Sequence, residues 1–279
     1  MSDGTPYLSF DVDYHDPEVV AVYDELPLWS ALFGLLLLRI VPLGAGMQVL
    51  DVGCGTGFPA LELAQRLGPG AKVWGIDRWE SAVARARLKA RRWDVTNVDL
   101  RVGDAANLPF PDGQFDLVVS NLGINNFAAP DAVMSECRRV AKPSAKLALT
   151  TNLVGHMREF YDVFDSTLLS LDLHAAAGAL QRHVAGRATV DAITALFARH
   201  GWRRSKVVAE TATLRFADGS ALLRHYFVKL AFLDGWKSVL EAADQEAVFT
   251  RLEANLNDLA RSRGELALTI PMAYCEAGA

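Results

Sequence analysis

The stretch VLDVGCGTGFPALELAQRLG, residues 49–68, constrains the fold of this chain more than any other segment. A short apolar run ends at Asp51, glycines follow at positions 53, 55 and 57, and a helical pattern then continues to Gly68. Glycine has no Cβ, so a glycine-rich turn between a strand and a helix lets the backbone approach a ligand closely. The stretch therefore predicts the first strand, ligand-binding loop and helix of an α/β sheet.

Strand and helix signals alternate from Met47 to Asn152. Alternation of short apolar strands with helices indicates a parallel sheet covered by helices on both faces. In this segment we predict strands at 48–52, 72–77, 98–104, 115–121 and 146–152, and helices at 59–68, 79–93 and 131–143.

After Asn152 the pattern is mostly helical, and two helices stand between the last two predicted strands. We therefore predict an α/β fold whose mostly parallel, seven-stranded sheet has a helical cap inserted before the last strand. The predicted elements are helical segments at 155–186 and 189–201, a strand at 204–216, helices at 220–240 and 244–264, and a strand at 266–277.

The most hydrophobic segment, Leu28–Ile40, is too short to cross a bilayer and contains Arg39. A buried helix is the simplest interpretation of this segment. An apolar flap over a lipophilic ligand, or a contact between subunits, is the alternative.

The composition argues against several classes of partner. The chain has 28 basic and 33 acidic residues and a net charge of −5, so it lacks the basic footprint that nucleic acids and anionic membranes require. Its acidic, polar N-terminus does not resemble a secretory signal. Cys54, Cys137 and Cys275 are far apart, so we predict no metal site and no disulfide framework, and expect a reducing cytoplasm.

The charged residues in and around the glycine loop indicate which class of ligand it binds. GTGFPA, residues 55–60, fits the dinucleotide pattern G-x-G-x-x-A, so an NAD(P)-dependent oxidoreductase is one hypothesis. However, the Asp51 carboxylate would face a pyrophosphate, and the loop contains no Lys or Arg to offset it. An acid at the strand end favours a ligand with a cationic group and no phosphate.

Several motifs together resemble those of class I S-adenosylmethionine-dependent methyltransferases. VLDVGCGTG resembles their first motif, VWGIDRW their second, and RVGDAANLPFPDGQFDLVVSN their third and fourth. The match spans residues 47–152, and LPFPDGQFD is most similar to the branch of ubiquinone- and menaquinone-biosynthesis methyltransferases. The resemblance implies a Rossmann-like, doubly wound core and S-adenosylmethionine as methyl donor, with S-adenosylhomocysteine as product. It also implies a small-molecule acceptor, which we expect to be apolar or aromatic.

With this resemblance, the chain divides into four predicted parts. They are an N-terminal helical arm at 1–46, an S-adenosylmethionine-binding core at 47–216, a helical cap or lid at 217–264, and the last core strand at 265–279.

The resemblance also assigns roles to residues around the loop. The glycines would let the backbone approach the methionine part of the cofactor, and Asp51 would attract its positive charge. Asp77 would accept hydrogen bonds from both ribose hydroxyls, although it could instead cap the following helix. Asp104 would bind the adenine amino group, although it could instead be a turn residue. The predicted cofactor-binding residues are Asp51, Gly53, Cys54, Gly55, Gly57, Asp77, Arg78, Trp79, Asp104, Ala105, Asn121 and Leu122.

Candidate general bases are few. His156 follows the fifth strand and is the first choice by location, while Tyr14 lies in the N-terminal arm and His225 in the predicted cap. A lone histidine is more often structural than catalytic. A general base is needed only if the acceptor carries its proton to the site.

Several other substrates and functions are disfavoured by the sequence, and others remain open hypotheses. SNLGINN, residues 120–126, lacks the prolines of methyltransferases that act on bases or amides, and arsenic methylation would need a set of thiols that this chain lacks. The basic run Arg85–Trp93 has the composition of a solvated helix face. A non-catalytic, cofactor-binding relative is a third hypothesis. The acceptor, the atom that is methylated and the oligomeric state are left open.

Overall fold

The computed structural model describes residues 5–26 and 28–279, so residues 1–4 and 27 of the predicted N-terminal arm lie outside the described residues. Contacts between Cα atoms group the chain into two compact units. Unit 1 comprises residues 1–12, 153–187 and 211–271, and unit 2 comprises 13–152, 188–210 and 272–279.

This grouping differs from the predicted parts in several places, since residues 211–216 and 265–271, predicted in the core, also belong to unit 1. Residues 153–187, which the sequence places in the core, group with the predicted cap. The physical reason is apolar packing between helices α6 (Arg158–Ser170) and α12 (Gln245–Arg263), where the ring centroids of Phe164 and Phe249 lie 5.9 Å apart. Periodicity reveals that both helices are amphipathic, but not that they face each other.

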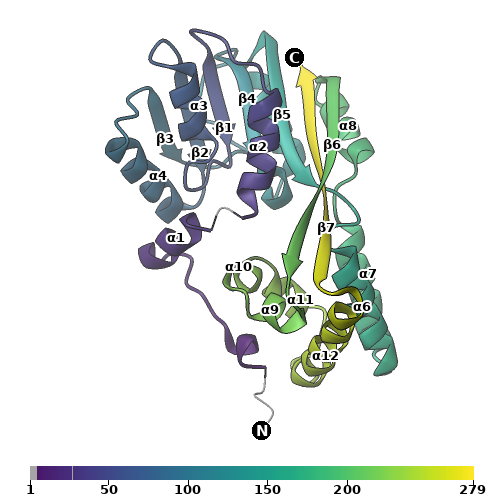
Figure 1. The fold of residues 1–279 in the computed structure, drawn as a ribbon. Helices are drawn as coiled ribbons and strands as arrows, with labels where there is room; N and C mark the ends of the chain where they lie inside the picture. The colour runs from purple at the N-terminus through teal and green to yellow at the C-terminus, as the bar shows by residue number, and fades with distance from the viewer. Residues whose placement is uncertain (1–4, 27) are drawn as a thin grey trace. The chain divides into compact units, whose positions relative to one another are not determined.

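The sheet has seven strands in the order β3-β2-β1-β4-β5-β7-β6, which confirms the predicted fold class (Figure 1). Neighbours among the first five strands pair in parallel, and β7 pairs antiparallel with β5. The strands are β1 (Gln48–Val52), β2 (Lys72–Asp77), β3 (Val98–Val102), β4 (Phe115–Asn121), β5 (Ala141–Asn152), β6 (Arg203–Phe216) and β7 (Leu266–Gly278).

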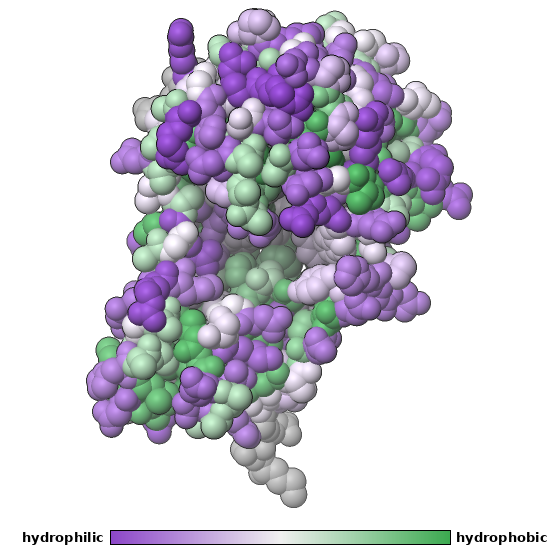
Figure 2. All heavy atoms as spheres, turned by 180° about the vertical axis from the view of Figure 1, so that it is seen from behind, coloured by the Kyte–Doolittle hydropathy of each residue, from purple (hydrophilic) through white to green (hydrophobic). Residues whose placement is uncertain are grey.

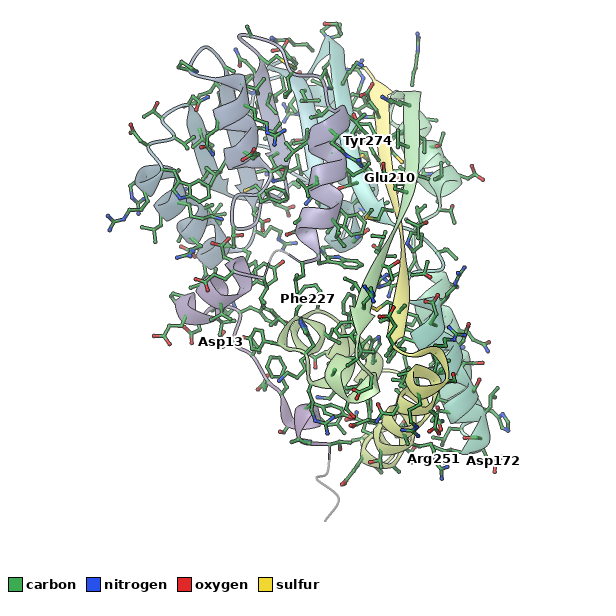
Figure 3. The ribbon with its side chains drawn as sticks, in the orientation of Figure 1. Asp13, Asp172, Glu210, Phe227, Arg251 and Tyr274 are labelled. Carbon is green, nitrogen blue, oxygen red and sulfur yellow. The ribbon has the colours of Figure 1, made fainter. Side chains whose placement is uncertain are left out.

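Polar side chains reinforce the pairing of β5 with β7 in unit 2. The hydroxyl of the buried Tyr274, labelled in Figure 3, donates to Glu276 Oε2 at 2.7 Å. Glu276 Oε1 accepts from Lys146 Nζ of β5, also at 2.7 Å. A buried carboxylate requires such partners, so these contacts stabilise the antiparallel pairing of β7 with β5.

The helices of unit 2 cover this sheet, and Figure 1 shows α2 and α3 in front of it and α8 behind it. Helix α2 buries Phe33, Leu36 and Leu37, as expected for the most hydrophobic segment. The helical elements of unit 2 are α1 (Pro17–Asp24), α2 (Ser30–Ile40), α3 (Ala60–Leu67), α4 (Glu80–Arg92), η2 (Gly123–Asn126), α5 (Pro130–Val140) and α8 (Val190–Arg199).

One predicted boundary in unit 2 is wrong. Helix α5 ends at Val140, and Pro143 lies inside β5 instead of at the end of the helix. The register between β4 and β5 shifts between Phe115 and Leu117, so the ladder is irregular where the proline lacks an N–H to donate.

The predicted helix at 220–240 is also broken into pieces in unit 1. Helix α9 (Gly219–Arg224) ends at His225, whose backbone is extended, and α10 (Tyr226–Val228), a π-helical turn η3 (Lys229–Leu233) and α11 (Asp234–Lys237) follow. The Asp218 side chain starts α9 by accepting from the amide of Ala221 at 2.8 Å. The remaining elements of this unit are η1 (Pro6–Ser9) and α7 (His174–Ala185).

The surface seen in Figure 2 mixes hydrophilic and hydrophobic residues. Among the described residues, no helix combines the length and apolar character that crossing a membrane requires.

Candidate functional site

The carboxyl ends of β1, β2 and β3 lie side by side in unit 2. Val52 is paired with Ile76, and Asp77 with Val102, so the residues that follow these strands emerge at one edge of the sheet. The glycine loop follows β1 and is attached to β2, because the amides of Gly53 and Cys54 both donate to the Ile76 carbonyl at 2.9 and 3.1 Å. Ligands of open α/β sheets bind at this edge.

Two glycines of the loop are needed for different reasons. Gly55 has φ +49°, and a Cβ added there would meet nothing within 4 Å, so its backbone borders open space. Gly57 has φ +101°, and a Cβ there would lie 2.9 Å from Leu61 Cδ1 and 3.0 Å from Ala86 Cβ. Gly57 therefore permits close packing of the loop on its helices, whereas Gly55 leaves backbone accessible to a ligand.

Asp51 is a fully buried carboxyl group at the end of β1. Neither of its oxygens has a hydrogen-bond partner of normal geometry among the described residues. Burial, and then the charge of Asp77, raise the pKa of Asp51 to about 8, and the backbone amide of Ala60 offsets only part of this increase. A buried acid without a partner is costly, so this position favours a ligand that brings a positive charge or a hydrogen-bond donor.

Asp77 connects the glycine loop to the turn after β2. Its Oδ2 accepts from the Gly55 amide at 2.8 Å, and its Oδ1 accepts from the Trp79 amide at 2.9 Å. Each carboxylate oxygen has two lone pairs, so both can still accept a hydrogen bond from a ligand hydroxyl. Asp77 is thus held in place by two backbone amides and remains able to bind a diol.

Asp104 and Ala105 follow β3. Asp104 is exposed, and its Oδ1 accepts from the Ala106 amide at 2.9 Å within a turn, which is the turn role that the sequence left as an alternative. This bond leaves the second carboxylate oxygen available. Arg78 is exposed beside Asp77.

Trp79 is held by two tyrosines of the N-terminal segment. Its indole Nε1 donates to the Tyr14 carbonyl at 2.6 Å, and its ring packs edge-on against Tyr23 and Tyr14, with centroids 5.2 and 6.1 Å away. The Ser81 hydroxyl donates to the His15 carbonyl at 2.9 Å. Residues 14–23 therefore lie against the turn that follows Asp77.

Asn121 and Leu122 follow β4, and the structure uses the Asn121 side chain internally. Its Oδ1 accepts from the Thr150 hydroxyl at 2.7 Å, and its Nδ2 donates to the Ser30 carbonyl at 3.0 Å. The amide of Leu122, which has a left-handed backbone, donates to the Thr150 carbonyl at 3.1 Å. The side chain thus shapes the end of the strand, and its use in ligand binding stays a prediction.

Cys54 is buried within the glycine loop. Burial, and then the charges of Asp51 and Asp77, raise the pKa of its thiol. A thiol that resists ionisation is a poor nucleophile, so Cys54 fills space in the loop.

His156 lies in unit 1, in the loop between β5 and α6. It is completely buried, and its ring packs 5.6 Å from that of Phe232. Burial, and then the positive charge of Arg187, lower the pKa of His156 to about 2. A base works best when its pKa lies near the working pH, so this imidazole is a weak proton acceptor.

The other two candidate bases have different surroundings. Tyr14 is 41% exposed and belongs to unit 2, where it packs on Trp79. His225 belongs to unit 1 and packs edge-on against Phe216, and burial lowers its pKa. Its Nδ1 is buried and forms no hydrogen bond within the described part of the chain.

Unit 2 therefore brings Asp51, the glycines, Asp77 and Trp79 together, and adds Tyr14 through Trp79. His156 and His225 belong to the other unit. Within the ranges that the structure describes, no three His, Cys, Asp or Glu residues form a cluster that could hold a metal ion.

Sequence reasoning missed two groups of residues. The first is Tyr23, whose ring packs against Trp79. The sequence indicates only that a helix begins near it, at Asp16 and Pro17. The second is a half-buried arginine: Arg187 Nη2 donates to the Tyr161 hydroxyl at 2.8 Å, and Trp236 Nε1 donates to the same oxygen at 3.1 Å. No local pattern could reveal the second group, because its members come from distant parts of the chain.

Comparison with known proteins identifies similar sequences. A family model described as a methyltransferase domain matches residues 43–187, which is more than half of the chain. A demethylmenaquinone methyltransferase from Listeria welshimeri is 37% identical over 111 residues, covering 40% of this chain and 47% of that protein. An arsenite methyltransferase from Halobacterium salinarum is 28% identical over 171 residues, covering 61% of this chain and 41% of that protein. The chain thus spans less than half the length of these two relatives.

Solved structures show the same fold. The YcgJ protein from Bacillus subtilis superposes with a TM-score of 0.58 at 17% sequence identity, covering 89% of this chain and 98% of that one. Identity this low supports the fold alone.

Proposed function

Because the chain belongs to the methyltransferase-domain family, we propose that it transfers a methyl group from S-adenosylmethionine to a small apolar or aromatic metabolite. The observation that carries the proposal is the buried Asp51 carboxyl group beside an open glycine loop, whose oxygens have no hydrogen bond of normal geometry among the described residues. The predicted resemblance to class I methyltransferases is confirmed by the family match. The acceptor and the residues that perform the reaction remain part of the proposal.

The chemistry of the donor set fits this cofactor. A buried acid and an open backbone suit the positively charged methionine part, and the remaining lone pairs of Asp77 suit a ribose diol. Asp104 and Ala105, at the end of β3, would bind the adenine, and Arg78 and Trp79 would border it. When bound, S-adenosylmethionine supplies a methyl group on a cationic sulfur, which is a good leaving group.

The main task of the protein is then to align the two reactants. Correct alignment can contribute about 7–11 kcal/mol to lowering the barrier, whereas a general base contributes on the order of 10²–10⁴-fold. We propose that alignment dominates here, since His156 is a weak proton acceptor. His156 stays the first candidate base by location, with Tyr14 and His225 as alternatives.

Unit 1 carries a cluster of aromatic rings from the predicted cap and from α6. The rings of Phe160 and Trp236 stack with centroids 4.1 Å apart, and Phe232 stacks on Trp236 at 5.8 Å. Phe227, labelled in Figure 3, packs edge-on against Phe232 at 5.9 Å. Phe160, Phe227 and Trp236 are buried, so these rings form part of the core of this unit, and the proposed apolar or aromatic acceptor rests on the sequence resemblance.

The relatives suggest two acceptor classes, a quinone precursor and arsenite. The three cysteines are all buried, and they lie far apart in the fold, on the glycine loop, α5 and β7. Because arsenic is bound by thiolates, this distribution favours the organic acceptor.

The experiment that tests the proposal is a thermal shift with S-adenosylhomocysteine, NADH and NADPH in separate samples. A ligand at a hundred times its dissociation constant adds about 2.7 kcal/mol to the stability of the native state. For a chain of this size the melting temperature should rise by roughly 5–10 °C. A rise with S-adenosylhomocysteine alone supports the methyltransferase. A rise with a nicotinamide cofactor alone would instead support the oxidoreductase hypothesis.

A second measurement separates an enzyme from a non-catalytic relative. Candidate quinols and phenols are incubated with the protein and S-adenosylmethionine, and S-adenosylhomocysteine is quantified. Binding of S-adenosylhomocysteine without turnover of any acceptor in a broad panel would favour the non-catalytic hypothesis.

A further inference from the structure

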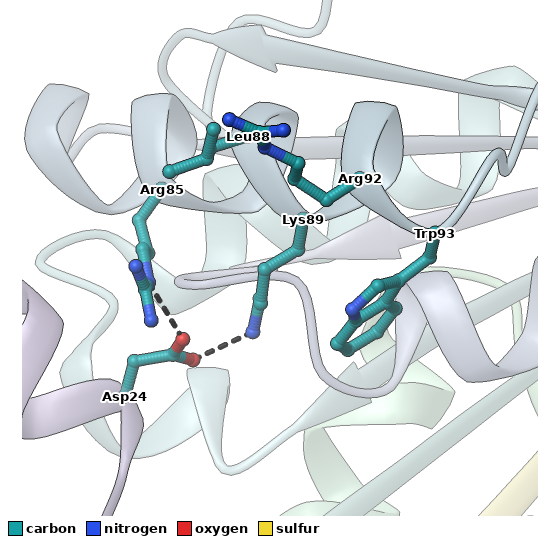
Figure 4. Close-up of a pocket in the computed structure, with 6 residues that line it drawn as sticks. All are labelled: Asp24, Arg85, Leu88, Lys89, Arg92 and Trp93. Atoms are coloured by element: carbon teal, nitrogen blue, oxygen red, sulfur yellow. Dashed lines mark hydrogen bonds and ion pairs between the residues drawn. The ribbon is translucent and has the colours of Figure 1, made fainter.

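A pocket lies in unit 2 between α1 and α4 (Figure 4). Its volume is about 360 Å³, within the range of small-molecule sites. It is lined by Asp24, Arg85, Leu88, Lys89, Arg92 and Trp93. The last five come from the basic run that the sequence predicts to be a solvated face.

The charges that line this pocket do not balance. Three of the six lining residues are cationic and only Asp24 is acidic, so the lining carries a net charge of +2 (three minus one) in a chain whose net charge is −5. Asp24 Oδ2 accepts from Arg85 Nε at 2.9 Å, and Oδ1 accepts from Lys89 Nζ at 2.6 Å (Figure 4). One carboxylate therefore orients two cations and neutralises only one of them.

Many donors of these cations remain available. Among the described residues, Arg85 contacts Asp24 through Nε alone, so its two terminal nitrogens can donate to a ligand, and Lys89 retains two of its three protons. Arg92 is exposed, and among the described residues it has no ion pair. A tetrahedral dianion could accept hydrogen bonds from all three side chains.

The pocket also has an aromatic wall. The Trp93 side chain is 53% exposed, which is unusual for so large a ring. Lys89 Nζ lies 5.6 Å from the Trp93 ring centroid, so the ring and the cations border the same space. An exposed indole beside free cations offers a stacking surface to a planar anion.

We propose that this pocket is a binding site for a small phosphate ester that carries a planar ring. The phosphate group binds Arg85, Lys89 and Arg92, and the ring stacks on Trp93. None of these four residues is among the proposed cofactor-binding residues, and the binding does not depend on methyl transfer.

The pocket is connected to the glycine loop through Asp24. Burial alone would raise the pKa of Asp24, but hydrogen bonds from Lys89, Arg85 and the Thr56 hydroxyl outweigh it and lower the pKa. Thr56 belongs to the glycine loop, so α1, α4 and the loop meet at one carboxylate. Arg92 and Trp93 take no part in this contact, which makes them the suitable residues to change.

The test is calorimetric titration of the full chain with phenyl phosphate at constant ionic strength, because salt screens exposed charges. Arg92→Ala should weaken binding by about tenfold, the effect of losing a hydrogen bond to a charged group. Arg91→Ala is the matched control: this neighbouring arginine is equally exposed but does not line the pocket, so its loss should change affinity by about twofold or less.

The ring is tested with Trp93→Ala. This change should weaken phenyl phosphate binding by about fivefold or more and leave the weaker binding of inorganic phosphate unchanged. All replaced residues are exposed, so the variants should fold, and circular dichroism checks this. Three results would overturn the proposal: no binding of phenyl phosphate at millimolar concentration, equal losses in the Arg91 and Arg92 variants, or equal effects of Trp93→Ala on both ligands.

Discussion

Replacing Asp51 by Asn tests the central feature of the proposed cofactor site. The side chains have nearly the same shape, but Asn cannot ionise. The pKa of Asp51 is about 8 in the folded protein and about 3.8 in the unfolded chain, so the folded state holds its proton more tightly. Between these values the folded state binds more protons than the unfolded state, and stability therefore falls as pH rises, by about 1.4 kcal/mol per pH unit.

The Asp51→Asn variant should lose this dependence of folding stability on pH. Below about pH 4 Asp51 is neutral in both states and has no cost, and above about pH 8 its full cost is present. From pH 5.5 to 7.5 the stability of Asp51→Asn relative to the natural chain should rise by about 2–3 kcal/mol. Urea unfolding at several pH values measures this difference, and Asp162→Asn, an exposed change in α6, is the control expected to stay flat. Parallel curves for the natural chain and Asp51→Asn would refute the reasoning.

Ligand binding provides an independent readout of the same group. A positive charge near Asp51 lowers its pKa, so S-adenosylmethionine should release close to one proton at pH 7 and bind more tightly as pH rises toward 8. Calorimetry in two buffers of different ionisation enthalpy counts the proton. Asp51→Asn should release none, and unchanged release in this variant would place the charged group elsewhere.

Three further changes test other parts of the molecule. Asp77→Ala should weaken binding of S-adenosylhomocysteine by about 2–5 kcal/mol in a titration, because it removes a charged acceptor that also holds the loop; unchanged affinity would exclude its proposed role. Gly57→Ala should destabilise the fold by about 1–3 kcal/mol more than Gly68→Ala in urea unfolding, because both have positive φ but only Gly57 is crowded; equal losses would contradict the packing argument. His156→Gln should leave the pH profile of turnover between pH 5 and 9 unchanged in shape, since a group with a pKa of about 2 does not titrate there; loss of an inflection near pH 6–7 would assign that titration to His156.

The order of strands and helices in unit 2 could be predicted from the sequence, because the local spacing of apolar residues indicates each element. The glycine loop, the strand that precedes it and the helix that follows all occur where the pattern of residues 49–68 indicates. The acids at or just beyond the carboxyl ends of β1, β2 and β3 could also be placed at one edge, since parallel strands align these ends. The start of α8 could also be predicted, because threonine is a common N-cap residue. The Thr189 side chain accepts a hydrogen bond from the Ala192 amide and so caps this helix.

Features that depend on contacts between distant segments could not be predicted. Pro143 suggested the end of a helix, but an irregular pairing with β4 accommodates it within a strand. The helix predicted at 220–240 is broken after Arg224, because packing within unit 1 overrides its uniform helical propensity. Residues 153–187 group with the inserted helices because α6 and α12 bury each other's rings.

The chemical character of the candidate residues was likewise decided by the tertiary structure. The sequence identified Asp51 and His156, but only complete burial raises the pKa of one to about 8 and lowers that of the other to about 2. The run Arg85–Trp93 is an ordinary basic helix face by sequence. It becomes a pocket because Asp24, brought by α1 from a distant part of the chain, orients two of its cations. Local pattern determines which elements form, whereas desolvation and charge pairing depend on which elements meet.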